Sequence, residues 1–229
     1  MPVYRTLNHA FFSAWSSDMA YVLGFFAADG SMLKNRRGAH FIEFNITDGE
    51  LLFLIQKTLG SDHLISRRKR KPQYSYVYRL QVGSKQLFAD LEKLGFTQAK
   101  SNSLRMPVIP KKFLPDFVRG YFDGDGCIYF KRLKFADRKK PRWVLQTIFT
   151  CGSKRFLRDL QLILQQYGVA GGSIRRKTRG FDLLLSHRDS VALFKIMYHT
   201  IPATGLFLPR KYNTFCKAIK ILYPDAVVV

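Results

Sequence analysis

The chain of 229 residues is 47% apolar and carries 38 basic against 16 acidic residues, which gives a formal net charge of +22. This apolar content excludes a disordered chain, and the basic excess indicates a polyanionic partner because it otherwise costs stability through self-repulsion. No segment reaches transmembrane length and no leader with a cleavage site is visible. We therefore expect no membrane partner and an intracellular location, in a bacterial cytoplasm or an organelle matrix.

The first half of the chain is predicted to form one lobe over residues 18–97, after an N-terminal extension at residues 1–17. Residues 40–47 alternate apolar and polar side chains as a half-buried strand does. Asp18 and Asp48 are the expected N-caps of the two helices that flank the first hairpin. The expected elements are helix 18–28, strands 31–36 and 40–47, helix 49–59, strands 63–71 and 74–82, and helix 85–94.

The same order recurs over residues 111–229, after a polar linker at 98–110. The expected elements are helix 111–123, strands 127–135 and 143–150, helix 153–167, strands 172–178 and 181–186, and helix 189–198. A last helix at 209–222 has no counterpart of equal length in the first half. The sequence thus predicts an α+β (mixed α/β) fold of two pseudo-twofold-related αββαββα lobes. Each lobe is an antiparallel β-sheet covered by helices on one face, and the other face meets solvent or a ligand.

One ten-residue pattern occurs twice, as YVLGFFAADG ending at Gly30 and as FVRGYFDGDG ending at Gly126. Its two last acidic residues, Asp29 and Asp125, are 125 − 29 = 96 residues apart, which is the length of a small domain. Small residues recur one helical turn apart in both copies, at Ala20, Gly24 and Ala28 and at Gly120 and Gly124. Such stripes let two helix backbones approach closely, so we expect the helices to pack on a shared axis.

If the two helices pack in this way, the carboxylates of Asp29 and Asp125 meet at one point, beside glycines expected in C′ positions. Taken singly, each Asp-Gly is ordinary turn chemistry. Their duplication at equivalent points favours a metal site, because two adjacent carboxylates repel each other unless cations lie between them.

The segments VLGFFAADG (Val22–Gly30) and VRGYFDGDG (Val118–Gly126) resemble the LAGLIDADG motif of homing endonucleases. The order of elements around each motif also matches that family, so the resemblance covers nearly all of the chain beyond residue 17. It implies a single-chain, monomeric enzyme whose two sheets form a saddle on double-stranded DNA. The implied reaction is a double-strand break in a long, largely asymmetric DNA site by divalent-metal-dependent phosphodiester hydrolysis.

The resemblance also implies roles for particular residues. Asp29 and Asp125 would bind two or three Mg²⁺ ions, with the carbonyls of Ala28 and Gly124 beside them, and Mn²⁺ or Ca²⁺ could replace Mg²⁺ in binding. Lys100 and Lys211 would be catalytic residues at the edge of the site, or else ordinary surface lysines that contact phosphate. Asp48 and Ser153 would order water or simply cap helices. Asp123 would have a structural role.

Basic runs at 67–71 and 175–179 occupy the same hairpin strand of each lobe, on the uncovered side of a sheet. Outward side chains of a β-ribbon can contact base edges, while Lys and Arg at strand ends hold phosphates. On strand 74–82 we expect Tyr74, Tyr76 and Tyr78 to face the helices. The residues expected to contact DNA are Arg37, Glu43, Asn45, Arg67, Arg68, Lys69, Arg70, Lys71, Ser75, Arg79, Gln81, Lys131, Lys139, Lys140, Arg142, Gln146, Arg175, Arg176, Lys177 and Arg179.

Two alternatives use the same fold without this cleavage. One is an intron RNA maturase, and the other is a DNA-binding protein that does not cut. A maturase would suit damaged motif aspartates or an extra basic surface, and a DNA-binding regulator would normally carry an added recognition domain. Asp29 and Asp125 are intact, so the nuclease is favoured. With no splicing domain in the sequence, a free-standing or intron-encoded enzyme is expected rather than an intein product.

Overall fold

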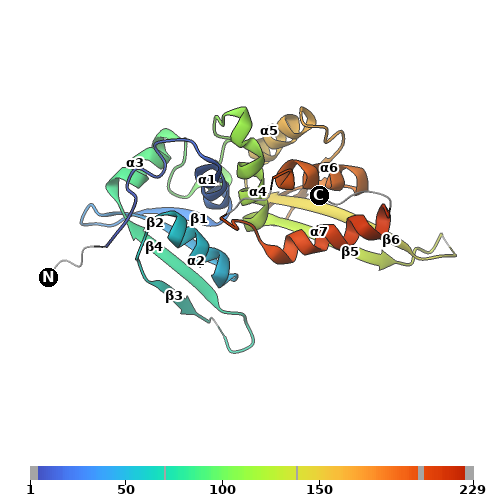
Figure 1. Ribbon diagram of the computed structural model, residues 1–229, viewed down its shortest axis with the longest axis horizontal. Helices are drawn as coiled ribbons and strands as arrows, with labels where there is room; N and C mark the ends of the chain where they lie inside the picture. Colours follow the sequence, from blue (N-terminus) through green and yellow to red (C-terminus); the bar gives the residue numbers. More distant parts are fainter. Residues whose placement is uncertain (1–4, 70, 138, 201–203, 225–229) are drawn as a thin grey trace.

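The computed structural model of the chain describes residues 5–69, 71–137, 139–200 and 204–224. Two lobes lie side by side, and helices α1 (Ser17–Asp29) and α4 (Leu114–Asp125) stand between them (Figure 1). Each lobe contains a four-stranded antiparallel sheet, with the strand orders β1-β2-β4-β3 and β5-β6-β8-β7. The two-lobed αββαββα architecture predicted from the repeat is confirmed.

The elements follow the expected order closely. The first lobe continues with β1 (Gly30–Lys34), β2 (His40–Ile46), α2 (Gly49–Thr58), β3 (Ile65–Arg68), β4 (Val77–Gly83) and α3 (Lys85–Lys93). The second continues with β5 (Gly126–Leu133), β6 (Arg142–Cys151), α5 (Lys154–Gln165), β7 (Ser173–Lys177), β8 (Gly180–Leu185), α6 (His187–Tyr198) and α7 (Pro209–Leu222). Two short 3-10 turns, Lys100–Asn102 and Lys111–Phe113, lie in and just after the segment that joins the lobes.

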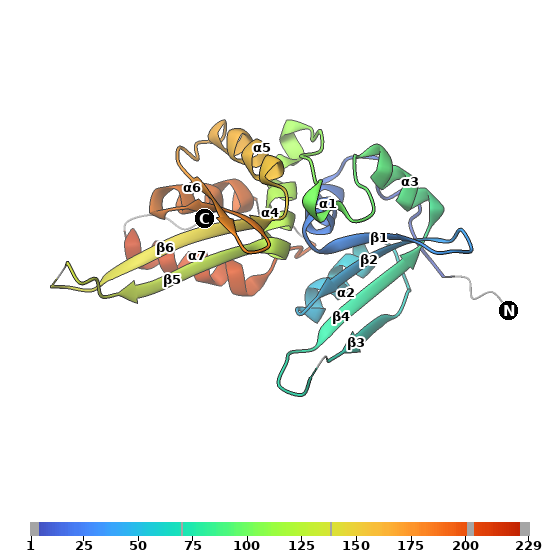
Figure 2. The same ribbon diagram turned by 180° about the vertical axis from the view of Figure 1, so that it is seen from behind.

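Strand register makes the two sheets directly comparable. Gly30 pairs with Phe44 across β1 and β2, and Gly126 pairs with Phe149 across β5 and β6. Phe44 and Phe149 are fully buried, whereas the residues before and after them face away from the core. Seen from behind, β2 and β4 lie in front of α2, so the helices cover only one face of the sheet (Figure 2). The other face is the expected ligand surface.

Of the two expected N-caps, Asp18 is wrong, and Asp48 is at the expected position but makes no capping hydrogen bond. Helix α1 begins one residue early and its N-cap is Ser16, whose hydroxyl accepts from the Met19 amide. Asp18 instead accepts a hydrogen bond from Thr204 of the second lobe, at 3.0 Å. Asp48 stands at the N-cap of α2 but makes no capping hydrogen bond. Ser153, its counterpart before α5, does cap its helix by accepting from the Phe156 amide.

The second hairpin of the first lobe is shorter than predicted. Strand β4 begins at Val77, so Tyr74 and Ser75 lie in a loop and the expected inward face of tyrosines does not extend past Tyr78. Tyr76 is 40% exposed, and the cations of Arg67 and Lys69 lie 5.1 and 4.4 Å from its ring centroid. Strand β3 pairs with β4 only as far as Val77, so the residues before Val77 have no partner strand. Pro72 favours a loop there, since proline cannot donate to a strand ladder.

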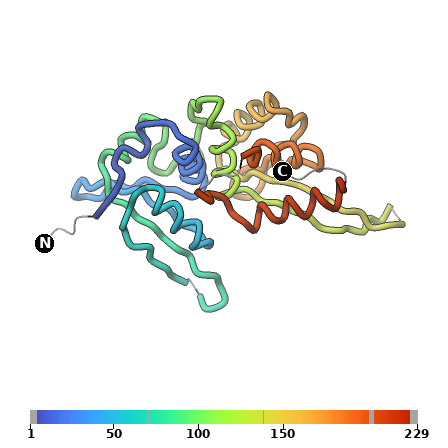
Figure 3. Tube along the Cα trace, in the orientation of Figure 1, coloured from blue at the N-terminus to red at the C-terminus, as the bar shows by residue number. Residues whose placement is uncertain are grey.

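Helix α7 has the predicted boundaries, and its path explains its role. It begins beside the junction of the two lobes and runs outward along the second lobe (Figure 3). Its first turn therefore brings residues from the end of the chain to the centre of the molecule. Among the helices of the described residues, none is long and apolar enough to cross a bilayer.

Candidate active site between the lobes

The two motif helices touch backbone to backbone. A Cβ atom built on Gly24 would lie 2.1 Å from the Phe117 carbonyl oxygen, and one built on Gly120 would lie 2.0 Å from that of Tyr21. These two approaches are the same contact seen from each helix, as a pseudo-twofold axis requires. Only glycine fits at a distance this short, because any real Cβ would overlap the carbonyl. The close packing predicted from the small-residue stripes is confirmed.

The glycines after the motif aspartates have a different role from the one expected. Gly30 and Gly126 have φ values of −85° and −86° and begin the first strand of each lobe, so they are not left-handed C′ residues. A Cβ atom on Gly30 would lie 2.1 Å from the Phe26 ring, and one on Gly126 would lie 2.2 Å from the Phe122 ring. Glycine is needed there because the strand turns back over a phenylalanine of its own helix.

The two motif carboxylates lie where the helices converge. A Cβ atom on Gly124 would lie 2.4 Å from the Ala28 Cβ and 3.3 Å from Asp29 Oδ2, so the Asp29 carboxylate lies directly against the other helix. Burial, and then the charge of Asp125, raise the pKa of Asp29 to about 7. Burial also raises the pKa of Asp125 above its ordinary value. Two carboxylates share one poorly hydrated site, and their mutual repulsion favours a cation between them.

Lys100 and Lys211 are buried on either side of this site, with 6% and 4% exposure, so neither is a surface lysine. Lys100 Nζ donates to the Ala27 carbonyl at 2.9 Å. Lys211 Nζ donates to the carbonyls of Phe122, Asp123 and Gly126 at 2.6, 2.8 and 2.6 Å. Burial lowers the pKa of each ammonium to about 8, against the opposing pull of nearby aspartates. The lysines hold the last turns of the motif helices and place positive charge beside the carboxylates.

Asp123 is the sixth residue of its motif and has structural contacts. Its carboxylate is 1% exposed and accepts from the Tyr21 hydroxyl at 2.8 Å and from the Leu208 amide at 3.0 Å. It thereby joins α1, α4 and the segment that leads into α7. Sequence reasoning did not foresee Tyr21, whose hydroxyl crosses from the other lobe. The sequence signal that could have indicated this contact is a tyrosine beside the small residues of a motif helix.

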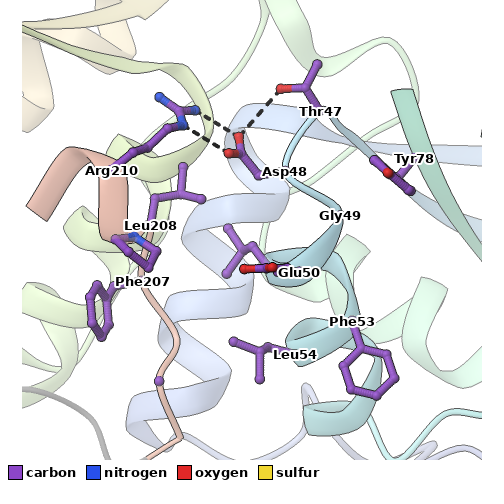
Figure 4. Close-up of a pocket in the computed structure, with 13 residues that line it drawn as sticks. Thr47, Asp48, Gly49, Glu50, Phe53, Leu54, Tyr78, Phe207, Leu208 and Arg210 are labelled. Carbon is purple, nitrogen blue, oxygen red and sulfur yellow. Dashed lines mark hydrogen bonds and ion pairs between the residues drawn. The ribbon is translucent and has the colours of Figure 1, made fainter. Parts of the chain in front are cut away.

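The two outer edges of the lobe junction differ. On one edge Arg210, beside Lys211, donates to both oxygens of Asp48 at 2.9 and 2.8 Å, so this ion pair joins the lobes (Figure 4). It borders a cavity of about 910 Å³ whose apolar lining includes Leu54 and Leu208. On the other edge, a Cβ atom on Gly152 would lie 2.5 Å from the Ser101 carbonyl oxygen. Arg210 was not predicted, because nothing in the local sequence identifies Asp48 as its partner.

Most residues expected to contact DNA are exposed. Those exposed are Arg37, Arg67, Arg68, Lys69, Lys71, Ser75, Lys131, Lys139, Lys140, Arg142, Arg175, Arg176, Lys177 and Arg179. Asn45, Arg79, Gln81 and Gln146 are half-buried on the uncovered sheet faces, and Glu43 is buried at 9% exposure. Arg70 lies outside the described residues. The strand register places Arg68 and Arg175 on the uncovered faces, whereas Arg67 and Arg176 pair with Tyr78 and Phe181, which pack against the core.

The donor set at the helix ends suits a hard divalent cation. Across the described ranges, no group of three or more His, Cys, Asp or Glu side chains is placed to hold a metal. Asp29 and Asp125 therefore offer two carboxylates without the nitrogen or sulfur ligands that zinc prefers. Mg²⁺ and Ca²⁺ accept a few carboxylates together with carbonyl, water and phosphate oxygens. The arrangement fits such an ion, with Ala28 and Gly124 as the adjoining backbone.

This combination defines a class of protein: two α+β lobes joined by glycine-packed helices, with paired carboxylates at the junction and a basic uncovered sheet face on each side. A family model described as LAGLIDADG-like domain matches residues 16–95 and 113–195, one match in each lobe. The chain belongs to the LAGLIDADG family.

Curated relatives match parts of much longer proteins. The chain is 30% identical over 125 residues to a probable translation initiation factor of Thermococcus kodakarensis, covering 53% of this chain and 9% of that protein. It is 26% identical over 177 residues to an RNA polymerase subunit of Methanocaldococcus jannaschii, covering 75% of this chain and 18% of that protein. A reverse gyrase of the same organism is 26% identical over 105 residues, with 46% and 6% covered. The chain spans less than a fifth of each of these relatives.

Solved structures show the same fold at low sequence identity. The meganuclease I-AabMI bound to uncleaved DNA has a TM-score of 0.62 and 14% identity, covering 90% of this chain and 91% of its own. The meganuclease I-SmaMI, bound to uncleaved DNA in the presence of calcium ions, has a TM-score of 0.58 and 16% identity, with 93% of each chain covered. I-SmaMI bound to cleaved DNA has a TM-score of 0.58 and 16% identity, with 91% and 89% covered.

Proposed function

We propose that this protein is a site-specific homing endonuclease that makes a double-strand break in a long, largely asymmetric DNA site. The observation that carries the proposal is the pair of half-buried carboxylates, Asp29 and Asp125, at helix ends that glycines hold in contact. Membership of the LAGLIDADG family and likeness to DNA-bound meganucleases support it. The net charge of +22 favours binding to DNA, the polyanionic partner that the proposal requires.

Two or three Mg²⁺ ions are proposed as the cofactors, held by Asp29 and Asp125 with the carbonyls of Ala28 and Gly124. The raised pKa of Asp29 is the observation that supports a cation there, since burial and the Asp125 charge both disfavour its anion. A divalent ion at this place would polarise the scissile phosphate and lower the pKa of a water molecule. Ca²⁺ and Mn²⁺ have the same preference for oxygen ligands and would replace Mg²⁺ in binding.

The chain's own basic residues would position the carboxylates and the DNA and offset negative charge on the phosphate. Lys100 and Lys211 supply two buried positive charges beside the carboxylates, which offset the charge that develops on a phosphate under attack. Their bonds to motif-helix carbonyls fix where the carboxylates lie. The exposed arginines and lysines of β3 and β7 are proposed to hold the DNA backbone on both sides, with the protein acting as a monomer.

The direct test is selection of cleaved sites from a random DNA library in Mg²⁺. The wild type is compared with Asp29→Asn, Asp125→Asn and a matched control, Asp159→Asn, which removes a carboxylate on α5, outside the site. Recovery of one long asymmetric site by the wild type and the control alone is the expected result. Selective DNA binding without cleavage in any variant would contradict the nuclease and indicate a DNA-binding protein that does not cut. Binding of RNA instead would favour the maturase.

A further inference from the structure

The uncovered face of the first sheet carries a closed polar network around Glu43. Arg79 Nη2 lies 2.6 Å from Glu43 Oε2, Asn45 Nδ2 donates to Oε1 at 2.8 Å, and Gln81 Nε2 donates to Oε2 at 3.2 Å. The strand register explains the cluster, because Glu43 pairs with Gln81 and Asn45 pairs with Arg79 across β2 and β4. Three donors therefore converge on one carboxylate that is itself 9% exposed.

This geometry gives Glu43 and Arg79 different roles. An ionised carboxylate only accepts hydrogen bonds, and Glu43 is already bonded by three side chains, so little of it is left for a base edge. Arg79 has a side chain 34% exposed, and its ion pair uses Nη2. The Nη1 group and the second Nη2 proton lie outside that ion pair, and a guanidinium fork is the donor arrangement that matches guanine O6 and N7.

Two atoms in this network lack partners. Arg79 Nε and Asn45 Oδ1 are buried with no hydrogen-bond partner among the residues that the structure describes. Buried polar atoms are normally satisfied, so these two atoms are where the hydrogen bonding of the network itself is incomplete. A cavity of about 770 Å³ beside Asn45, lined also by Arg68 and Val77, lies on the same face.

The second lobe lacks this device at the matching positions. Phe44 pairs with Leu80 and Phe149 with Leu183, so Arg79 corresponds to Asp182 and Glu43 corresponds to Ile148. Asp182 is bonded by Thr150 at 2.7 Å and by Lys177 at 3.0 Å. A carboxylate cannot donate to guanine, so the contact available to the first lobe is not repeated in the second.

We propose that Arg79 reads a guanine in the half-site bound by the first lobe, and that Glu43 is the positioning residue that holds its guanidinium. This inference rests on the proposed function, because it requires a DNA target. Asn45 and Gln81 complete the support by fixing the Glu43 carboxylate from both sides. The guanine preference from this pair of positions belongs to the half of the site bound by the first lobe, because Asp182 and Ile148 take the matching places in the second.

The test measures relative affinities for a library of single-base variants of the selected site, in Ca²⁺, with the full chain. Arg79→Gln should lose about 10-fold or more of the preference for guanine at one base pair. Glu43→Gln should weaken the preference at that same base pair, by about 3-fold or more, and the double variant should match Arg79→Gln alone. The matched control Arg68→Gln, on the next strand, should lower affinity uniformly and reduce the salt dependence.

Three results would overturn the assignment. If Glu43→Gln changes a different base pair from Arg79→Gln, Glu43 reads a base itself. If it lowers only the melting temperature and leaves base preference intact, its role is structural. If the wild type is sequence-selective but has no guanine preference that depends on Arg79, Arg79 does not read a guanine. The proposed function would still stand. A wild type without any sequence selectivity would instead reject the site-specific function and this inference together.

Discussion

The two lobes are nearly equivalent where their helices meet and clearly different on the sheet faces. At the junction, Gly24 and Gly120 make the same backbone approach, and Lys100 and Lys211 each bond a carbonyl of their own motif helix. On the faces, the Arg79–Glu43 pair of the first lobe stands where the second lobe has Asp182 and Ile148. A pseudo-twofold centre with unequal faces suits the proposed cleavage of both strands of an asymmetric DNA site.

Substitutions at the glycine contacts between α1 and α4 should give the largest loss of stability. Gly120→Ala places a Cβ against the Tyr21 carbonyl, and Gly24→Ala does the same against Phe117. In an isolated helix, replacing glycine by alanine would increase stability by about 1 kcal/mol. A loss of stability would therefore show that the helix contact outweighs helix propensity. We expect a loss of about 3 kcal/mol or more in unfolding free energy from overpacking, measured by denaturant titration. Gly83→Ala is the control, since its Cβ would lie 3.4 Å from the Phe41 ring. A Gly120→Ala protein as stable as the wild type would rule out the close crossing.

The buried lysines test how equal the two halves of the centre are. Lys211→Met removes a donor from three carbonyls, of which that of Phe122 keeps its bond from the Gly126 amide, whereas Lys100→Met removes a donor from one. Unsatisfied buried carbonyls cost about 1–3 kcal/mol each, so Lys211→Met should lose about 2 kcal/mol and Lys100→Met about 1 kcal/mol. Each variant also removes a desolvated charge, which makes the difference between them more informative than either loss. Equal losses in denaturant titration would show that the extra bonds of Lys211 add nothing.

Asp29→Asn should stabilise the protein when no metal is present. The folded-state pKa of Asp29, about 7, lies above its ordinary value, so the folded protein holds this proton more tightly than the unfolded chain does. Stability is therefore highest below about pH 4 for this group and falls as the pH rises through 7. At pH 8 the asparagine variant should gain on the order of 1 kcal/mol, seen as a melting temperature about 2–4 °C higher in chelator. A lower melting temperature at pH 8 would mean that Asp29 carries no such penalty.

The Asp48–Arg210 pair gives the smallest expected effect. It tests the ion pair that joins the lobes at one edge of their junction. The bidentate hydrogen bond from Arg210 lowers the pKa of Asp48, so its stabilisation is present above the ordinary carboxyl pKa and is lost as the pH falls through the lowered value. Asp48→Asn should lower the melting temperature at pH 7 by about 1–3 °C, as expected of an exposed ion pair, and by less at pH 3. Ser153→Ala, which removes a helix cap on the other edge, should show no such pH dependence.

Sequence patterns predicted the parts of this molecule that depend on local repetition. The motif helices, the alternation along β2 and the limits of α7 all follow from spacing within a few residues. Ser16, Ser17 and Asp18 are all good cap residues, so the local sequence does not decide between them, and the bond that Asp18 accepts instead comes from distant Thr204. The partners of Asp48 and Asp123 are likewise far away in the chain. The network around Glu43 required the pairing of β2 with β4, because residues 43 and 79 come together only through that register.

The most direct test of the account is strand-resolved, single-turnover cleavage of the selected site in Mg²⁺. Asp29 and Asp125 are taken to serve one shared centre, since the charge of Asp125 raises the pKa of Asp29. The wild type should cut both strands, and Asp29→Asn and Asp125→Asn should each cut neither. Either variant that cuts one strand at the wild-type rate would contradict the shared centre and indicate two independent sites.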